Sequence, residues 1–284
     1  MINLFYSEND WAHTGGRLSG PQKVVENLIR SLKDLDIKYA VNEEVYEKNF
    51  LIAWNYSTYK SLQNKESLLI GPQFWPWGRD VLSLGVYNKI ICPSNTTKKI
   101  YTEFFPDLKV SVWPVGIYPP NIVDNIKFDC LVYYKNRDQN DLQMTLEFLE
   151  KRNISYTGLE YGNYSQEEFK ESLSEVKYCV IVDNTESQGI ALQEMMSVGR
   201  PLFVWNHTEG TRTDYMGNNY KIKATTIPYW SDECGEYVDD FAEFETKFDI
   251  FLSKLNEYQP QKFIERELSP QRSIEILLEL FENV

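Results

Sequence analysis

Cysteine and histidine are scarce in this chain, which has four cysteines and two histidines among 284 residues. The cysteines, Cys92, Cys130, Cys179 and Cys234, lie far apart and form no C-x-x-C pair. Zinc sites and disulfide frameworks need such residues at close spacing. Because three of the four stand in apolar, strand-like runs, we expect small buried thiols in a reducing compartment. The expected location is the cytoplasm, and no metal site is expected.

Long apolar runs and positive charge are also in short supply. No stretch approaches the roughly 20 apolar residues that a membrane-spanning helix requires. The first residues, MINLFYSENDW, lack the basic start and apolar centre of a secretory signal and predict a first strand instead. Acidic side chains outnumber basic ones by 42 to 29, a net charge of −13. Nucleic-acid binding needs a basic surface, so we expect no nucleic-acid partner and no transmembrane segment.

Strand-like and helix-like segments alternate along the whole sequence, which predicts the α/β class with largely parallel sheets. The length suits two domains of about 140 residues each. Strands are predicted at 2–6, 39–41, 50–54, 68–70, 89–92 and 110–113, and after a restart at 128–134, 178–182 and 202–205. The proline- and glycine-rich segment 114–120 between the two sets is the expected linker.

Helices are predicted where apolar residues recur at helical spacing. Such faces occur at 24–35, 142–149, 241–255 and 274–281. Ser165-Gln166-Glu167-Glu168 has the form of a capping box, which predicts a further helix start. Ser269-Pro270 is the expected start of the last helix.

The segment 178–205, YCVIVDNTESQGIALQEMMSVGRPLFVW, carries the strongest functional signal. A buried strand is followed by a helix that opens at Gly189 and ends before Gly199-Arg200-Pro201. The free N–H groups and the dipole of a helix N-terminus make an anion site. Glu186 and Glu194 flank this helix start and suit ligand hydroxyls. Together they predict a pocket for a nucleoside diphosphate attached to a sugar.

The stretch from Glu186 to Glu194 resembles the E-x7-E motif of retaining GT-B glycosyltransferases of the group 1, or family 4, type. Residues 195–201 resemble that family's EAMACGxPV continuation. The resemblance implies two Rossmann-like domains facing across a cleft. Residues 1–117 would form the acceptor side, 118–266 the nucleotide-sugar donor side, and 267–284 a helix that crosses back to the N-terminal domain.

The resemblance also implies roles for individual residues. Glu186 would contact the donor sugar, Glu194 would hold the ribose hydroxyls, and Gly189 and Ile190 would give backbone N–H groups to the phosphates. The acceptor hydroxyl would attack on the leaving-group face while the departing phosphate helps to take its proton. No metal and no cofactor would be needed, since the nucleotide-sugar is itself a substrate.

Lys135 and Arg137 stand just beyond the strand predicted at 128–134. A positive pair there would meet the diphosphate and stabilise its charge as the sugar leaves. The family has an Arg and a Lys in an R…KG pattern, whereas here they are two positions apart with no Gly following. Which of the two contacts the diphosphate is left open, and a solvated basic loop is the alternative.

Two loops in the first half are further candidates. Gly15 and Gly16 follow the first strand, where open α/β sheets bind ligands, and resemble the glycine loop of the family's N-terminal domain. His13 lies beside them. Gln73, Trp75 and Trp77 belong to an aromatic loop, 71–79, whose rings suit stacking on an acceptor sugar or packing as a lid.

The sequence therefore predicts a retaining glycosyltransferase, of hexosyltransferase type, that moves a sugar from a nucleoside-diphosphate sugar to a hydroxyl of a glycan, a glycolipid or another acceptor. Two alternatives are a non-catalytic module that binds sugars or nucleotide-sugars and a nucleotide-sugar epimerase. The base, the sugar, the acceptor and the linkage are left open.

Overall fold

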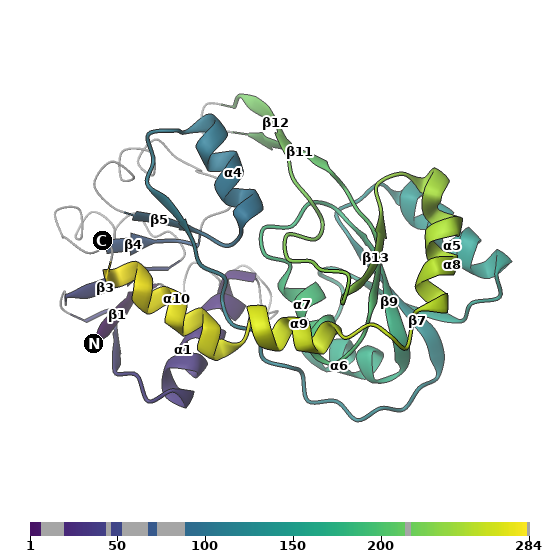
Figure 1. The fold of residues 1–284 in the computed structure, drawn as a ribbon, viewed down its shortest axis with the longest axis horizontal. Helices are drawn as coiled ribbons and strands as arrows, with labels where there is room; N and C mark the ends of the chain where they lie inside the picture. The colour runs from purple at the N-terminus through teal and green to yellow at the C-terminus, as the bar shows by residue number, and fades with distance from the viewer. Residues whose placement is uncertain (7–19, 44–46, 53–67, 73–88, 214–216, 283–284) are drawn as a thin grey trace. The chain divides into compact units, whose positions relative to one another are not determined.

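The computed structural model describes all residues except 7–19, 44–46, 53–67, 73–88, 214–216 and 283–284. The chain forms two compact units (Figure 1). The first contains Met1–Gly116, Thr211–Ile222 and Leu268–Val284, and the second contains Ile117–Gly210 and Lys223–Glu267. The chain thus leaves the first unit within the predicted linker, returns to it at Thr211–Ile222 and returns again for the last helix. The cleft predicted between the two domains stays a prediction.

The first unit is built on a six-stranded sheet of order β2-β1-β3-β4-β5-β6. Its strands are β1 (Ile2–Phe5), β2 (Tyr39–Val41), β3 (Lys48–Leu51), β4 (Leu68–Ile70), β5 (Lys89–Cys92) and β6 (Val110–Val112). All five pairings are parallel. The central strands are buried along nearly their whole length. Because a parallel sheet is covered on both faces, such strands are short, continuous apolar runs, as predicted here.

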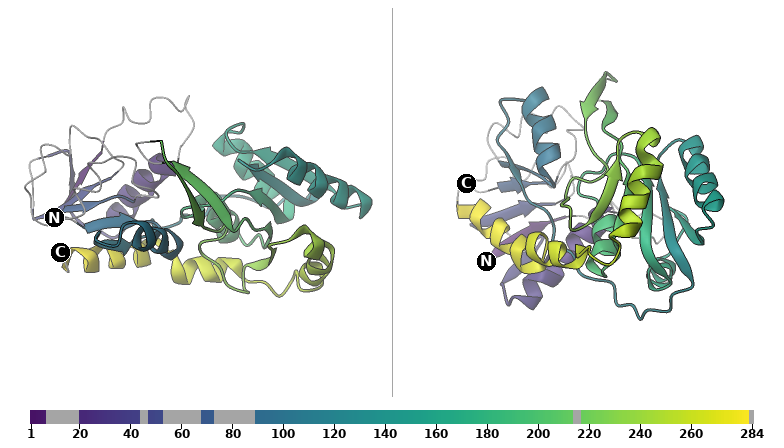
Figure 2. Two further views of the ribbon diagram at one scale, coloured as in Figure 1. Left: turned by 90° about the horizontal axis from the view of Figure 1, so that it is seen from above. Right: turned by 45° about the vertical axis from the view of Figure 1, so that its right-hand side comes forward.

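Three helices of the first unit are α1 (Gly20–Asp34), α4 (Asn95–Phe104) and α10 (Pro270–Glu282). The last of these, α10, runs beside α1 (yellow beside purple in Figure 1 and on the right of Figure 2). Two hydrogen bonds fix it there: the Trp113 indole N–H donates to the Ser273 carbonyl over 2.9 Å, and the Ser273 hydroxyl donates to the Pro114 carbonyl over 2.8 Å. The last helix is therefore part of the core of the first unit.

Gly116 is required where α10 begins. A Cβ at this position would lie 2.5 Å from Pro270 Cα, and the backbone there cannot move aside cheaply. We expect Gly116→Ala to lower the free energy of unfolding by about 1–3 kcal/mol, the usual cost of overpacking. Gly20→Ala is the matched control, because a Cβ at Gly20 meets nothing within 4 Å. Urea unfolding followed by tryptophan fluorescence measures both, and equal stabilities would contradict this packing.

The second unit is built on a five-stranded sheet of order β13-β10-β9-β7-β8, again parallel. Its strands are β7 (Phe128–Lys135), β8 (Tyr156–Glu160), β9 (Val176–Asp183), β10 (Leu202–Trp205) and β13 (Gly235–Val238). A separate two-stranded sheet, most of which belongs to the first unit, pairs β11 (Glu209–Thr213) with β12 (Asn219–Lys223). The two long strands, β7 and β9, lie side by side at the centre, and both end at the edge where the candidate site is found.

Helices cover both faces of this sheet (Figure 1). One face carries α5 (Gln139–Lys151) and α8 (Phe244–Ser253), and the other carries α6 (Gln166–Ser174), α7 (Ile190–Ser197) and α9 (Pro260–Glu267). Under α8, the Phe203 ring of β10 contacts Phe244 and Phe248 edge-on, with centroids 4.9 and 5.0 Å apart. Tyr178, Phe251 and Trp205 extend this aromatic core. The core holds the strands whose ends carry the site.

The structure confirms the predicted α/β class and most predicted elements. Strands at 39–41, 68–70, 89–92 and 202–205 have the predicted bounds, whereas that predicted at 178–182 is longer, Val176–Asp183. The capping box at Ser165 and Glu168 is formed in both directions. The helix predicted at 241–255 opens with a 3₁₀ turn, η2 (Phe241–Glu243), whose start is capped by the Asp240 side chain, which accepts the Ala242 N–H. No helix among the described residues is both long enough and apolar enough to cross a membrane.

Candidate active site

The site is centred on the adjacent ends of β7 and β9. Lys135 and Asp183 are the last residues of these strands and stand opposite each other in the sheet register. The Lys135 ammonium donates to Glu186 Oε1, in the loop that follows β9, and lies 4.6 Å from the centre of the Tyr161 ring. The Lys135 and Glu186 side chains are only 19% and 12% exposed, so their ion pair is largely shielded from solvent.

The charges around Lys135 keep it protonated. Burial alone lowers the pKa of Lys135, but its acidic neighbours, the Glu186 carboxylate first, raise it by more, so that its pKa lies above the ordinary lysine value. A shielded cation is therefore held at the carboxyl edge of the sheet, where open α/β sheets bind ligands.

Gly189 shapes the start of α7. Its φ of 82° is left-handed, a conformation that glycine adopts without strain. Gly189 has no side chain with which to cap the helix itself. Gln188, just before Gly189, is linked to Gln193 within α7: the Gln193 side-chain amide donates to the Gln188 main-chain carbonyl over 2.6 Å, and the Gln188 side-chain amide donates to Gln193 Oε1 over 3.0 Å. These buried hydrogen bonds fix the turn between Glu186 and the start of α7.

Two tyrosines that the sequence patterns did not predict, Tyr133 and Tyr164, lie near the Lys135–Glu186 pair. Tyr164, between β8 and α6, donates to the Tyr133 hydroxyl over 3.4 Å. The pKa of Tyr164 is raised, first by burial and also by Glu194, while the Tyr133 hydrogen bond and Lys135 lower it. Tyr164 therefore lies within electrostatic reach of both Glu194 and Lys135. Tyr164 soon follows β8, which ends at the same edge of the sheet as β7. An aromatic residue in that position is a sequence signal that could have predicted its place.

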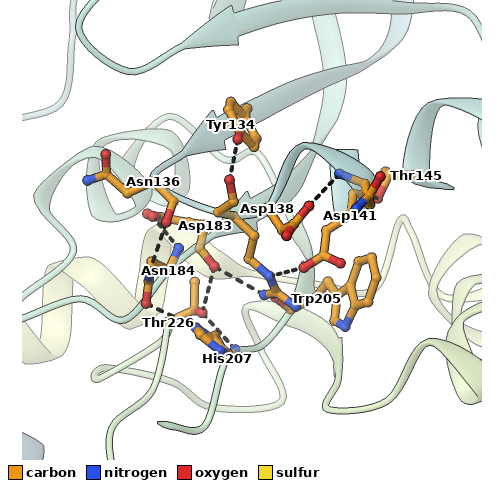
Figure 3. Close-up of polar contacts among 12 residues, drawn as sticks. Tyr134, Asn136, Asp138, Asp141, Thr145, Asp183, Asn184, Trp205, His207 and Thr226 are labelled. Atoms are coloured by element: carbon orange, nitrogen blue, oxygen red, sulfur yellow. Dashed lines mark hydrogen bonds and ion pairs between the residues drawn. The ribbon is translucent and has the colours of Figure 1, made fainter. Parts of the chain in front are cut away.

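The Arg137 side chain is buried and engaged with the protein itself. Its guanidinium contacts the Asp141 carboxylate at 2.6 Å and donates to the main-chain carbonyls of Trp205 and Asp183 at 2.7 and 3.1 Å. It also lies 4.7 Å from the centre of the Trp205 ring, and its side chain is 7% exposed. Figure 3 shows Asp141, Asp183 and Trp205 gathered at this point. Arg137 therefore joins the ends of β9 and β10 to the start of α5.

A second polar network supports the loop that carries Glu186. His207 Nδ1 lies 3.0 Å from Asn184 Oδ1, and the His207 backbone N–H donates to the Thr226 hydroxyl over 2.9 Å (Figure 3). The Glu186 backbone N–H donates to the Thr225 carbonyl over 2.9 Å. Burial, followed by the nearby Arg137, lowers the pKa of His207, so that its ring is neutral at pH 7. Through these contacts His207 supports the loop that carries Glu186.

The remaining candidates are Gly15, Gly16, His13, Gln73, Trp75 and Trp77, which lie outside the described residues. Within the described part of the chain, no three or more His, Cys, Asp or Glu side chains come together in a way that would hold a metal ion. The four cysteines are free thiols and are buried.

Comparison with known proteins identifies the fold. No known family model matches the sequence, and no curated protein matches it either. Among solved structures, sucrose-phosphate synthase from Thermosynechococcus elongatus is similar, with a TM-score of 0.61 at 10% identity over 99% of this chain and 98% of that one. The lipopolysaccharide outer core galactosyltransferase WaaB in its apo form matches with a TM-score of 0.57 at 12% identity over 100% of both chains.

A third similar structure is a mutant of S. aureus TarM in complex with Fondaparinux, alpha-GlcNAc-glycerol and UDP. It has a TM-score of 0.53 at 12% identity and covers 91% of this chain and 58% of that one. Together with the parallel α/β architecture, these likenesses show that the chain has the GT-B fold.

Proposed function

We propose that the protein is a retaining glycosyltransferase that moves a sugar from a nucleoside-diphosphate sugar to a hydroxyl of a glycan, a glycolipid or another acceptor. The observation that carries this proposal is the shielded Lys135–Glu186 ion pair at the ends of β7 and β9, in the same unit as the start of α7. A cation and a helix N-terminus suit a diphosphate, and a carboxylate suits sugar hydroxyls. The GT-B fold shared with WaaB and sucrose-phosphate synthase supports it.

In this proposal the protein supplies positioning and charge, and no side chain acts as a nucleophile. Lys135 meets the diphosphate together with the N–H groups of Gly189 and Ile190, and Glu194 holds the ribose hydroxyls. Glu186 contacts the donor sugar. Arg137 is the less suitable diphosphate ligand, because its guanidinium is already engaged with Asp141 and two strand-end carbonyls. It stabilises the edge on which Lys135 stands.

The direct test is donor turnover by the purified protein, preceded by a thermal-shift panel of UDP, GDP and ADP. A ligand that binds only the folded state raises the melting temperature, so the panel identifies the base. Release of the sugar, or its transfer to an added acceptor, supports the proposal. Binding without turnover would favour the non-catalytic module, and a changed sugar still attached to the nucleotide would favour the epimerase.

Chelation should leave turnover intact. In the proposed mechanism Lys135 and the α7 N-terminus stabilise the leaving diphosphate, so no divalent cation is needed for that role. Rates in EDTA are therefore expected to match untreated rates within about twofold. Loss of turnover in EDTA, with recovery on adding Mn²⁺, would show that a metal carries the charge instead.

A further inference from the structure

Asp183 is a buried acid that the proposed mechanism does not use. It is the last residue of β9 and is 1% exposed. Its Oδ1 accepts the Asn184 backbone N–H over 2.6 Å, whereas its Oδ2 has no hydrogen-bond partner among the described residues. A buried carboxylate oxygen without a partner is costly, because desolvation of the charge is not repaid. The free-energy cost of burying the Asp183 carboxylate must therefore be reduced in another way.

The groups that face this carboxyl come from β7 and from the loop after β9. Lys135 and Tyr133 stand on β7, and Glu186 stands in the loop. The Lys135 ammonium is engaged with Glu186. Arg137 and Thr226 contact only the main-chain carbonyl of Asp183. If both acids were ionised, two carboxylates would share one lysine in a shielded place, leaving one negative charge unbalanced.

A proton removes that imbalance. Burial, followed by repulsion from Glu186, raises the pKa of Asp183 well above its usual range, although Lys135 opposes the shift. A protonated Asp183 turns an acceptor without a partner into a donor, and Glu186 is the neighbouring acceptor. The buried group then carries no charge, and Glu186 alone balances Lys135.

We propose that Asp183 is a positioning residue that keeps its proton and shares it with Glu186, so that Lys135 can leave Glu186 for the donor's diphosphate. When Lys135 moves, the proton stays between the two carboxyls, and the pair retains a single negative charge. No proton is gained or lost. The movement of Lys135 rests on the proposed function, whereas the shared proton does not.

Stability without any ligand tests the shared proton. The unfolded chain ionises Asp183 near pH 3.9, while the folded protein keeps the proton to a higher pH. The folded-to-unfolded ratio of the wild type, relative to Asp183→Asn, should therefore fall as pH rises above about 4, by up to tenfold per pH unit until the folded protein ionises. The asparagine is uncharged at every pH, so it lacks this dependence.

Asp129→Asn is the matched control. Burial raises the pKa of Asp129, but hydrogen bonds from Lys177 and Ser155 lower it by more, so that the net shift is downward. Relative to this variant, the wild type should gain stability as pH rises through about 4, the opposite sign. Equal pH slopes for the wild type and Asp183→Asn would overturn the proposal.

Carbon-13 NMR of the side-chain carboxyls follows the proton directly in the wild type, so the test does not depend on Asp183→Asn folding. One aspartate should titrate far above the others, and Glu186→Gln should move it downward because a repelling charge is removed. If every aspartate titrates near the usual aspartate pKa, the shared proton is ruled out.

The release of Lys135 is tested by the affinity for UDP of the wild type and of Asp183→Asn, compared at the same pH. Once Asp183 ionises, two carboxylates hold Lys135, so wild-type affinity should fall at least about tenfold relative to Asp183→Asn as pH rises. If UDP affinity depends on pH in the same way in both proteins, Lys135 is not released as proposed. The conclusion about the shared proton from stability would be unaffected. If neither UDP, GDP nor ADP binds the wild type, the proposed function and the release both fail, and the shared proton is judged by stability alone.

Discussion

Glu186→Ala is expected to lower donor turnover by about a hundredfold or more while free nucleoside diphosphate binds almost normally. Hydrogen bonds from sugar hydroxyls to a charged carboxylate are worth roughly 1.5–3 kcal/mol each, and the free nucleotide lacks the sugar that makes them. The substitution also releases the Lys135 ammonium from its ion pair, which favours rather than weakens contact with the diphosphate. The loss should therefore fall on kcat and not on nucleotide affinity.

Isothermal titration with the free nucleotide, alongside a donor-turnover assay, separates these two quantities. Glu171→Ala is the matched control, since this glutamate is an exposed residue of α6. Both variants should remain folded, because Glu186 lies outside the buried face of α7 formed by Leu192, Met195 and Met196. Unchanged turnover in Glu186→Ala would remove this residue from the active site.

Glu194→Ala is expected to weaken nucleoside diphosphate binding by more than about tenfold. Two ribose hydroxyls would lose a charged acceptor, and each 1.4 kcal/mol corresponds to a factor of ten in affinity. Glu194 is half-buried on the first turns of α7.

A nucleotide without ribose hydroxyls is the sharpest control for this substitution. The 2′,3′-dideoxy nucleoside diphosphate should bind the wild type and Glu194→Ala with equal affinity, because neither hydroxyl remains to be lost. A full loss of affinity for the dideoxy ligand in the variant would mean that Glu194 acts on α7 and not on the ribose. Unchanged binding of the ordinary nucleotide would take Glu194 out of the donor site.

Much of the fold is predictable from the sequence because its strands are short, buried and bounded by breakers. In a parallel sheet covered on both faces, an apolar run such as 202–205 is itself the strand, so its bounds can be predicted directly. Half-exposed elements were missed. The strand β8 alternates partly buried and exposed residues, and β11 and β12 form a largely polar two-stranded sheet, so neither gives a continuous apolar signal.

The site was predictable only in part, for a related reason. Glu186 and Glu194 lie close together in the sequence, and this local pattern predicted the start of α7. The pairing of Lys135 with Asp183 is set by the order of strands in the sheet, between residues 48 positions apart, and local periodicity carries no information about it. Asp183 itself extends the apolar run of β9, so its burial beside Glu186 could not be inferred without the sheet.

The way the chain returns to its first unit has a consequence for synthesis on the ribosome. Domains usually fold in the order in which they are made. Here the Trp113 indole and the buried face of α1 wait for α10, which follows them far along the chain. At roughly 5–20 residues per second, the segment from Ile117 to the end of α10 takes about 10–30 s to make, and residues before it wait that long for the helix. We therefore expect the unit that carries the proposed donor site to reach its native state first, while the earlier-made unit depends on chaperones during that interval.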